Sequence, residues 1–138
     1  MPNSYSVMFM AAKKEDEPKA ATAAPAGGDS NIIAAIAYIL GPIVAVIIYL
    51  IKKDDKFVRF HSMQSLLFGV AAFIMFMVLM VLITVISVVS GGIGSILGLC
   101  TLPLMLVIVL AALYLAYMAF TGKTYKLPVI GDMAEKYA

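Results

Sequence analysis

Two long stretches of this chain carry no charged side chain. Residues 32–51 are uncharged throughout, and no Asp, Glu, Lys or Arg occurs from Ser62 to Gly122. An α-helix rises 1.5 Å per residue, so about 20 residues match the roughly 30 Å hydrocarbon core of a bilayer. Of the 138 residues, 63% are hydrophobic and 13% are charged, which is more apolar surface than so small a core can hide. The two runs therefore predict helices that cross a membrane.

The longer run must contain more than one span. Its only cluster of helix-breaking residues is GGIGS at 91–95, and a turn there divides the run into spans over about 64–90 and 96–120. With the first span over 32–51, we predict an all-α, polytopic membrane protein with three transmembrane helices. Pro103 leaves a fourth span or a re-entrant segment open, because proline is favoured in the first turn of a helix.

The composition divides the chain into two parts. Residues 1–31 are rich in Ala, Pro, Gly and mixed charge, which is typical of a disordered tail. Residues 32–138 hold the predicted spans and a tail over 121–138, so we expect one helical membrane domain there.

The charged stretch KKDDKFVRFHSMQSLLF, residues 52–68, passes into the second span without a turn signal. On a helix its aromatic and polar side chains fall on one face and its cations on another, which is typical of an amphipathic helix at the lipid interface. We expect this short helix to run directly into the second span. The candidate residues for contact with lipid headgroups or a partner are Lys52, Lys53, Lys56, Phe57, Arg59, Phe60, His61 and Gln64.

His61, the only histidine, allows two interpretations. A histidine can change its charge near neutral pH, so with Arg59, Asp54, Asp55 and Gln64 it could form a proton-sensing, ion or headgroup site. Alternatively, Arg59 and the carboxylates form a surface network, and the histidine rests in the headgroup region. We favour the second interpretation and expect no metal, because one histidine beside two adjacent carboxylates lacks the spacing of metal ligands.

Small residues recur every four positions in the first predicted span. Ala37, Gly41 and Ala45 would share one face of a helix, where small side chains allow close helix contact. Pro42 removes a backbone hydrogen bond and should kink the helix at its midpoint. We expect these four residues to pack against another helix, either in the same chain or in a second copy.

The basic residues indicate an orientation. With three spans, the 52–59 loop and the C-terminal tail share one side and hold seven Lys or Arg, against three before the first span. Since basic segments tend to stay cytoplasmic, we predict an external N-terminus and a cytoplasmic C-terminus.

The tail offers partners for the loop. We expect it to fold back so that Asp132 or Glu135 pairs with Arg59, since a guanidinium binds carboxylates in bidentate fashion. The candidate tail-docking residues are Tyr125, Pro128, Asp132 and Glu135.

Two motifs carry a resemblance to a known family. The F-x-R-F-H-x-x-Q pattern at 57–64 and GKTYKLPVIGDMAEKY at 122–137 resemble a widespread prokaryotic family of small membrane proteins. That family is classed as a domain of unknown function and is related to the twenty-kilodalton component of the chloroplast inner-envelope import apparatus. The similarity covers residues 32–138 and implies a polytopic helical protein in the cell membrane of a prokaryote. The plant relative's part in protein import implies a link to protein transport.

The sequence shows no arrangement typical of a catalytic site. A second histidine, a phosphate-binding loop and a carboxylate within a span are all lacking, so we expect no enzymatic activity and no cofactor. The net charge of +2 is too small to indicate nucleic acid, and the single cysteine excludes an intrachain disulfide.

We expect a scaffold or accessory subunit of a membrane complex, linked to protein translocation or membrane biogenesis. Its partners would be the lipid bilayer and another membrane protein or a second copy of the chain. The alternative is a small oligomeric channel or transporter, because a helix interrupted as at Gly41–Pro42 often marks an ion path.

Overall fold

The computed structural model describes residues 3–8 and 27–138, and every regular element within them is helical. The all-α class is therefore confirmed for this part of the chain. Residues 9–26, the centre of the predicted disordered tail, lie outside the described residues. A short helical segment covers residues 4–8, and the main elements are α2 (Gly28–Ile39), α3 (Pro42–Ile51), α4 (Lys56–Val89), the 3₁₀-helix η1 (Ile93–Cys100), α5 (Thr101–Phe120) and α6 (Ile130–Tyr137).

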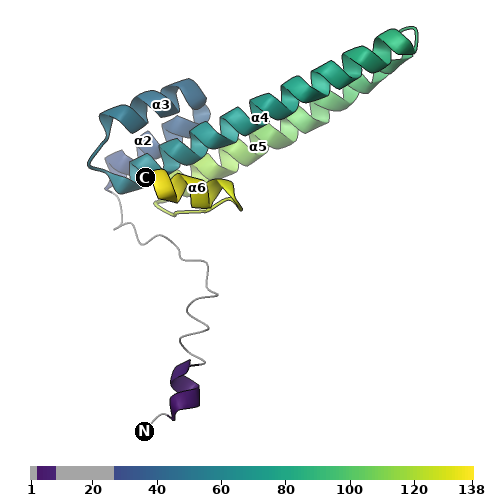
Figure 1. Cartoon of the computed structure of the whole chain (residues 1–138). Helices are drawn as coiled ribbons and strands as arrows, with labels where there is room; N and C mark the ends of the chain where they lie inside the picture. The colour runs from purple at the N-terminus through teal and green to yellow at the C-terminus, as the bar shows by residue number, and fades with distance from the viewer. Residues whose placement is uncertain (1–2, 9–26) are drawn as a thin grey trace.

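Helices α4 and α5 form a long hairpin that extends beyond the other elements (Figure 1). Lys56–Val89 and Ile93–Phe120 are long and apolar enough to cross a membrane, and they correspond to the second and third predicted spans. The chain reverses where predicted, at Gly91 and Gly92, whose φ angles of 66° and 98° favour glycine. The 3₁₀-helix η1 leads directly into α5, so the run past Pro103 is one candidate span.

The first predicted span is wrong as a continuous helix. Gly41 adopts a φ of 84° and ends α2, and Pro42 begins α3. The sequence indicated a kink at this point, but the positive φ of Gly41 reverses the chain. The two helices have 12 and 10 residues, about 15–18 Å each, roughly half of a bilayer's hydrocarbon core. The structure therefore supports two candidate spans and does not support a third.

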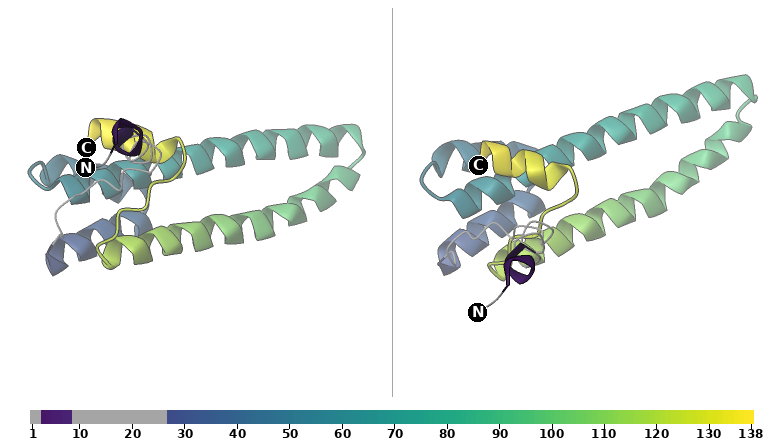
Figure 2. Two further views of the ribbon diagram at one scale, coloured as in Figure 1. Left: turned by 90° about the horizontal axis from the view of Figure 1, so that it is seen from below. Right: turned by 60° about the horizontal axis from the view of Figure 1, so that its bottom comes forward.

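Helices α2 and α3 fold back beside the first part of α4 (Figure 2). Ser30, near the start of α2, donates a hydrogen bond to Asp55 at the start of α4, with 2.5 Å between the oxygens. A Cβ added at Gly69 would lie 3.0 Å from side-chain carbons of Pro42, so the bend of the α2–α3 hairpin rests against α4 at this glycine.

We call the end of the molecule where α2 and α4 begin, α3 and α5 end, and α6 lies the base. We call the opposite part, residues 70–113, the distal hairpin. The core lies at the base, and its buried apolar side chains are Ala34, Ala35, Tyr38, Phe57, Val58, Leu115, Ala116 and Ala119. Every charged residue of the described part also lies at the base or beside it. Polar and apolar surface are thus separated along the long axis.

The start of α2 and the end of α5 lie together at the base. A Cβ added at Gly122 would lie 3.2 Å from the side-chain nitrogen of Asn31, and α6 packs against α4 close by. The prediction that the two ends of the chain face opposite sides required a continuous first span, which the structure does not contain.

Candidate functional site

The first turns of α4 carry a cluster of buried polar side chains. His61, Ser62, Gln64 and Ser65 are each at most 4% exposed. Asp55 begins this helix as its N-cap, because its carboxylate accepts a hydrogen bond from the Val58 backbone N–H at 3.1 Å. As expected, the helix continues without a break into the span.

The predicted position of this segment at the lipid interface is wrong for its aromatic face. Phe57 and Phe60 are each 3% exposed, and His61 and Gln64 are fully buried. Helix α2 and the end of α5 cover this face. Packing inside the protein removes the two aromatic rings from water, as insertion at the lipid interface would also do. These four side chains therefore do not contact headgroups.

His61 lies among aromatic rings. Its ring centroid is 4.5 Å from that of Phe57 and 5.3 Å from that of Phe60, with the rings edge to face. Its Nδ1 lies 3.2 Å from the Tyr38 hydroxyl, and its Nε2 has no hydrogen-bond partner. Neither sequence interpretation placed the histidine inside the core.

Gln64 and Ser65 tie α4 to two other segments. The side-chain amide of Gln64 donates to the Tyr125 carbonyl at 2.9 Å, and the Ser65 hydroxyl donates to the Ala37 carbonyl at 2.6 Å. By contrast, the Gln64 Oε1 and the Ser62 hydroxyl are buried without a partner. The cluster thus joins the tail, α4 and α2 but leaves some of its polar atoms unsatisfied.

Arg59 joins α3, α4 and α6. Its Nη2 donates to the Tyr49 hydroxyl at 2.9 Å, and its guanidinium carbon lies 4.4 Å from the centroid of the Tyr49 ring. It also donates to the backbone carbonyls of Tyr137 and Ala138, at 3.4 and 3.3 Å. The Tyr49 hydroxyl donates to the same Tyr137 carbonyl at 2.6 Å. We call Arg59, Tyr49 and the two carbonyls the arginine latch.

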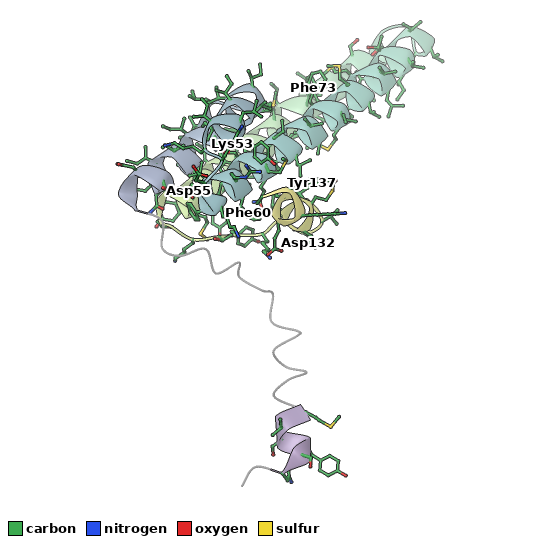
Figure 3. The ribbon with its side chains drawn as sticks, turned by 60° about the vertical axis from the view of Figure 1, so that its left-hand side comes forward. Lys53, Asp55, Phe60, Phe73, Asp132 and Tyr137 are labelled. Atoms are coloured by element: carbon green, nitrogen blue, oxygen red, sulfur yellow. The ribbon has the colours of Figure 1, made fainter. Side chains whose placement is uncertain are left out.

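The tail folds back as expected, but through other groups. Asp132 is exposed (Figure 3), and Glu135 pairs with Lys126 at 2.6 Å, so neither carboxylate is the partner of Arg59. The predicted Arg–Asp surface network is likewise wrong for Arg59, because backbone carbonyls and a tyrosine occupy its donors. Helix α6 begins at Ile130, so Asp132 lies in its first turn.

The remaining tail candidates take supporting positions. The Tyr125 ring lies edge to face with Tyr114, with 5.8 Å between the centroids. Pro128 is exposed and precedes Val129, whose φ is 68°. This residue turns the chain into α6.

Three of the four packing candidates pack within the same chain, and the fourth, Gly41, forms the turn between α2 and α3. Ala37 and Ala45 are fully buried, and Pro42 contacts Gly69. Because Gly41 reverses the chain, the alanines lie on two different helices and not on one face. The structure realises the intrachain alternative of the two left open by the sequence.

The basic candidates Lys52, Lys53 and Lys56 are exposed at the base, as are Lys123 and Lys136. They can reach lipid phosphates if the base lies at the membrane surface. In the part of the chain that the structure describes, no group of three His, Cys, Asp or Glu side chains is placed to hold a metal ion.

Sequence reasoning missed the two tyrosines that complete these contacts. Tyr38 and Tyr49 are the only side chains with a polar group in the run 32–51, and each reaches a polar residue of α4. Their isolation in an apolar run was the available signal.

Comparison with known proteins places this geometry in a membrane context. The family model for the magnetosome magnetite crystal formation protein family matches residues 17–134. A UPF0132 membrane protein of Methanocaldococcus jannaschii is 35% identical over 112 residues, which cover 81% of this chain and 91% of that protein. A UPF0132 membrane protein of Archaeoglobus fulgidus is 43% identical over 37 residues, covering 27% of this chain and 36% of that protein. No solved structure matches. These similarities support a prokaryotic membrane protein family and do not show the predicted link to the chloroplast import component.

Proposed function

Because this chain belongs to the magnetosome magnetite crystal formation protein family and its own archaeal relatives are named as membrane proteins, we propose that it is a non-enzymatic scaffold or accessory subunit of a membrane complex. The observation that carries this proposal is the uncovered apolar surface of the distal hairpin. Its chemistry is that of a surface for lipid and for other membrane helices.

The distal hairpin exposes large apolar side chains on both helices. Phe73 is 63% exposed (Figure 3), and Val81, Leu106 and Val107 are about as exposed. Helices α2, α3 and α6 reach only the base, so no other described element covers this surface (Figure 1). Large contiguous apolar patches on a protein surface occur at contacts with membranes or with other proteins. This surface supports a protein that works by contact within the bilayer.

The polar side chains at the base support a structural role for that region. His61 contacts Tyr38, Gln64 contacts the Tyr125 carbonyl, and Arg59 contacts Tyr49. Each of these contacts joins two different segments of the chain. We infer that their role is to hold the base together rather than to carry out chemistry on a substrate.

The charges support a cytoplasmic base. The basic residues of the described part all lie there, and residues 90–100 around the distal turn contain none. Basic segments tend to remain cytoplasmic. We propose two spans, with the start of α2 and the tail both on the cytoplasmic side of a prokaryotic cell membrane. This replaces the three-span arrangement, in which the two ends of the chain lie on opposite sides.

The family description names magnetite crystal formation. For this chain, we propose the role of a membrane-embedded scaffold on which other components assemble. More specifically, we propose that the complex takes part in protein translocation or membrane biogenesis.

Purification of the tagged full chain in mild detergent tests the scaffold role. We expect a second membrane protein to co-purify in fixed stoichiometry, as measured by native mass spectrometry. Phe73→Ala in the distal hairpin should reduce its recovery. Ile51→Ala should not reduce the recovery, because Ile51 lies at the base. It is a matched control, since Ile51 is 69% exposed and Phe73 is 63% exposed. A monodisperse monomer without a stoichiometric partner would contradict the proposal.

A small oligomeric channel is the second candidate. It is favoured by the discontinuous α2–α3 hairpin, whose two helices meet at Gly41, since broken helices line many ion paths. A homo-oligomer that conducts ions in liposomes would support this candidate, and a hetero-complex without ion flux would argue against it.

A further inference from the structure

The molecule has an uneven cross-section along its long axis. At the base, α2, α3 and α6 pack around α4 and α5 (Figures 1 and 2). The distal hairpin, by contrast, is only two helices wide. In the placement proposed above, the two ends of this axis lie in opposite halves of the bilayer. The width of the protein therefore differs between the two leaflets.

The outer surface of the α2–α3 hairpin requires lipid. Ile43 is 77% exposed at its bend, and Leu40 and Ile39 beside it are each 61% exposed. Helix α3 has one polar side-chain group, the Tyr49 hydroxyl, which is hydrogen-bonded to the tail. This apolar surface is continuous with that of α4, against which the bend rests at Gly69.

The length of the α2–α3 hairpin limits it to one leaflet. Ten residues of α3 span about 15 Å, half of a 30 Å hydrocarbon core. The end of α3 is joined to the exposed Lys52 and Lys53 at the base, which favour the headgroup region. The hairpin thus enters from the base side and ends near the middle of the bilayer.

We propose that the α2–α3 hairpin is a single-leaflet wedge, and that this protein prefers strongly curved bilayers in which the base lies on the convex side. The inference rests on the proposed two-span placement and adds a lipid partner of defined shape. A body that is wider in one leaflet fits best where that leaflet is expanded, and amphipathic elements that enter one leaflet are sensitive to curvature for the same reason.

Orientation in vesicles of two sizes tests the wedge. The natural cysteine, Cys100, is changed to serine, and single cysteines are introduced as Asp54→Cys at the base or Ser95→Cys near the distal turn. Each protein is reconstituted into vesicles of about 200 nm and about 50 nm diameter and labelled with a membrane-impermeant maleimide. The ratio of base to distal labelling should rise by about twofold or more in the small vesicles, because the wedge favours the convex leaflet.

A pair of substitutions in α3 separates the effect of the wedge on orientation from the effect of the part of the base that lies outside the membrane. Ile43→Lys places a cation at the deep end of the hairpin, where charge is strongly disfavoured, and should abolish the size dependence. Ile51→Lys makes the same change next to Lys52 at the base and should preserve it. Thermal unfolding in detergent checks that both variants fold. The comparison between the two vesicle sizes, made on the protein without substitutions in α3, tests the wedge even if a variant does not fold.

The outcomes distinguish the two levels of inference. Equal labelling ratios at both diameters, with the two sites still on opposite faces, would overturn the wedge and leave the two spans intact. External labelling of the two single-cysteine proteins in fractions that add to clearly more than one would overturn the two-span placement and the wedge with it. Unchanged size dependence in Ile43→Lys would assign the preference to the extramembrane bulk and would also overturn the wedge.

Discussion

Two neighbouring buried serines in α4 differ in hydrogen bonding. The Ser65 hydroxyl donates to the Ala37 carbonyl at 2.6 Å, whereas the Ser62 hydroxyl is buried without a partner. Loss of a buried hydrogen bond costs about 0.5–1.5 kcal/mol, but removal of an unpaired buried group can be neutral or stabilising. We predict that Ser65→Ala lowers the free energy of unfolding by about 1 kcal/mol, and that Ser62→Ala leaves it unchanged or raises it. Unfolding in mixed micelles measures both, and equal losses would contradict the assignment.

The arginine latch predicts which partner is coupled to Arg59. Arg59→Ala removes its bonds to Tyr49 and to the Tyr137 carbonyl, and Tyr49→Phe removes the shared hydroxyl. A double-mutant cycle on this pair should show coupling of about 0.5–1.5 kcal/mol. Arg59→Lys should not restore stability, because an ammonium lacks the planar fork of donors.

The control for this cycle combines Arg59→Ala with Asp132→Ala. Asp132 is exposed and makes no contact with Arg59 in the structure, so these two effects should be additive. Coupling to Asp132 but not to Tyr49 would restore the sequence-based hypothesis.

The start of α4 depends on one of two adjacent carboxylates. Asp55 accepts from the Val58 backbone N–H and from the Ser30 hydroxyl, whereas Asp54 is exposed. An N-cap contributes about 0.5–2 kcal/mol. Asp55→Ala should therefore destabilise the protein by at least 1 kcal/mol or so, and Asp54→Ala should have little effect. Thermal unfolding followed by circular dichroism gives the comparison.

The contact between the α2–α3 hairpin and α4 depends on a glycine. A side chain at Gly69 would collide with Pro42, whereas a Cβ at Gly98 would meet nothing within 4 Å. Gly69→Leu should cost about 1–3 kcal/mol through overpacking and expose the bend to protease, while Gly98→Leu should be tolerated. A fully stable Gly69→Leu protein would show that the hairpin does not rest there.

At the scale of helices, the sequence predicted much of the path of the chain. The continuous helix from Lys56 into the span and the reversal at 91–95 both occur where expected. The reversal at Gly41 was not predicted, because a glycine before proline fits either a kink or a turn. The choice depends on whether α2 and α3 gain more by packing on α4 than by contacting lipid on both sides.

For the whole molecule, the structure predicts that the two ends of the described domain share one side of the membrane. Single cysteines introduced as Asp29→Cys and Lys136→Cys, in a Cys100→Ser background, should be labelled from the same side. One introduced as Ser95→Cys should be labelled only from the other side. Labelling of residues 29 and 136 from opposite faces would restore the three-span arrangement.

The sequence by itself determined that this chain is helical and that its uncharged runs suit a bilayer, since hydrophobicity and helix length follow from local composition. It also located the residues near the start of α4 that matter, including Arg59, His61 and Gln64. Only the tertiary structure decided that the first run folds back, that His61 faces Tyr38, and that Arg59 binds Tyr49 and the tail. Local sequence could not decide these points, because each depends on competition between lipid and a distant segment for the same side chain. Packing across the whole base decides whether each of these side chains contacts lipid or the distant segment.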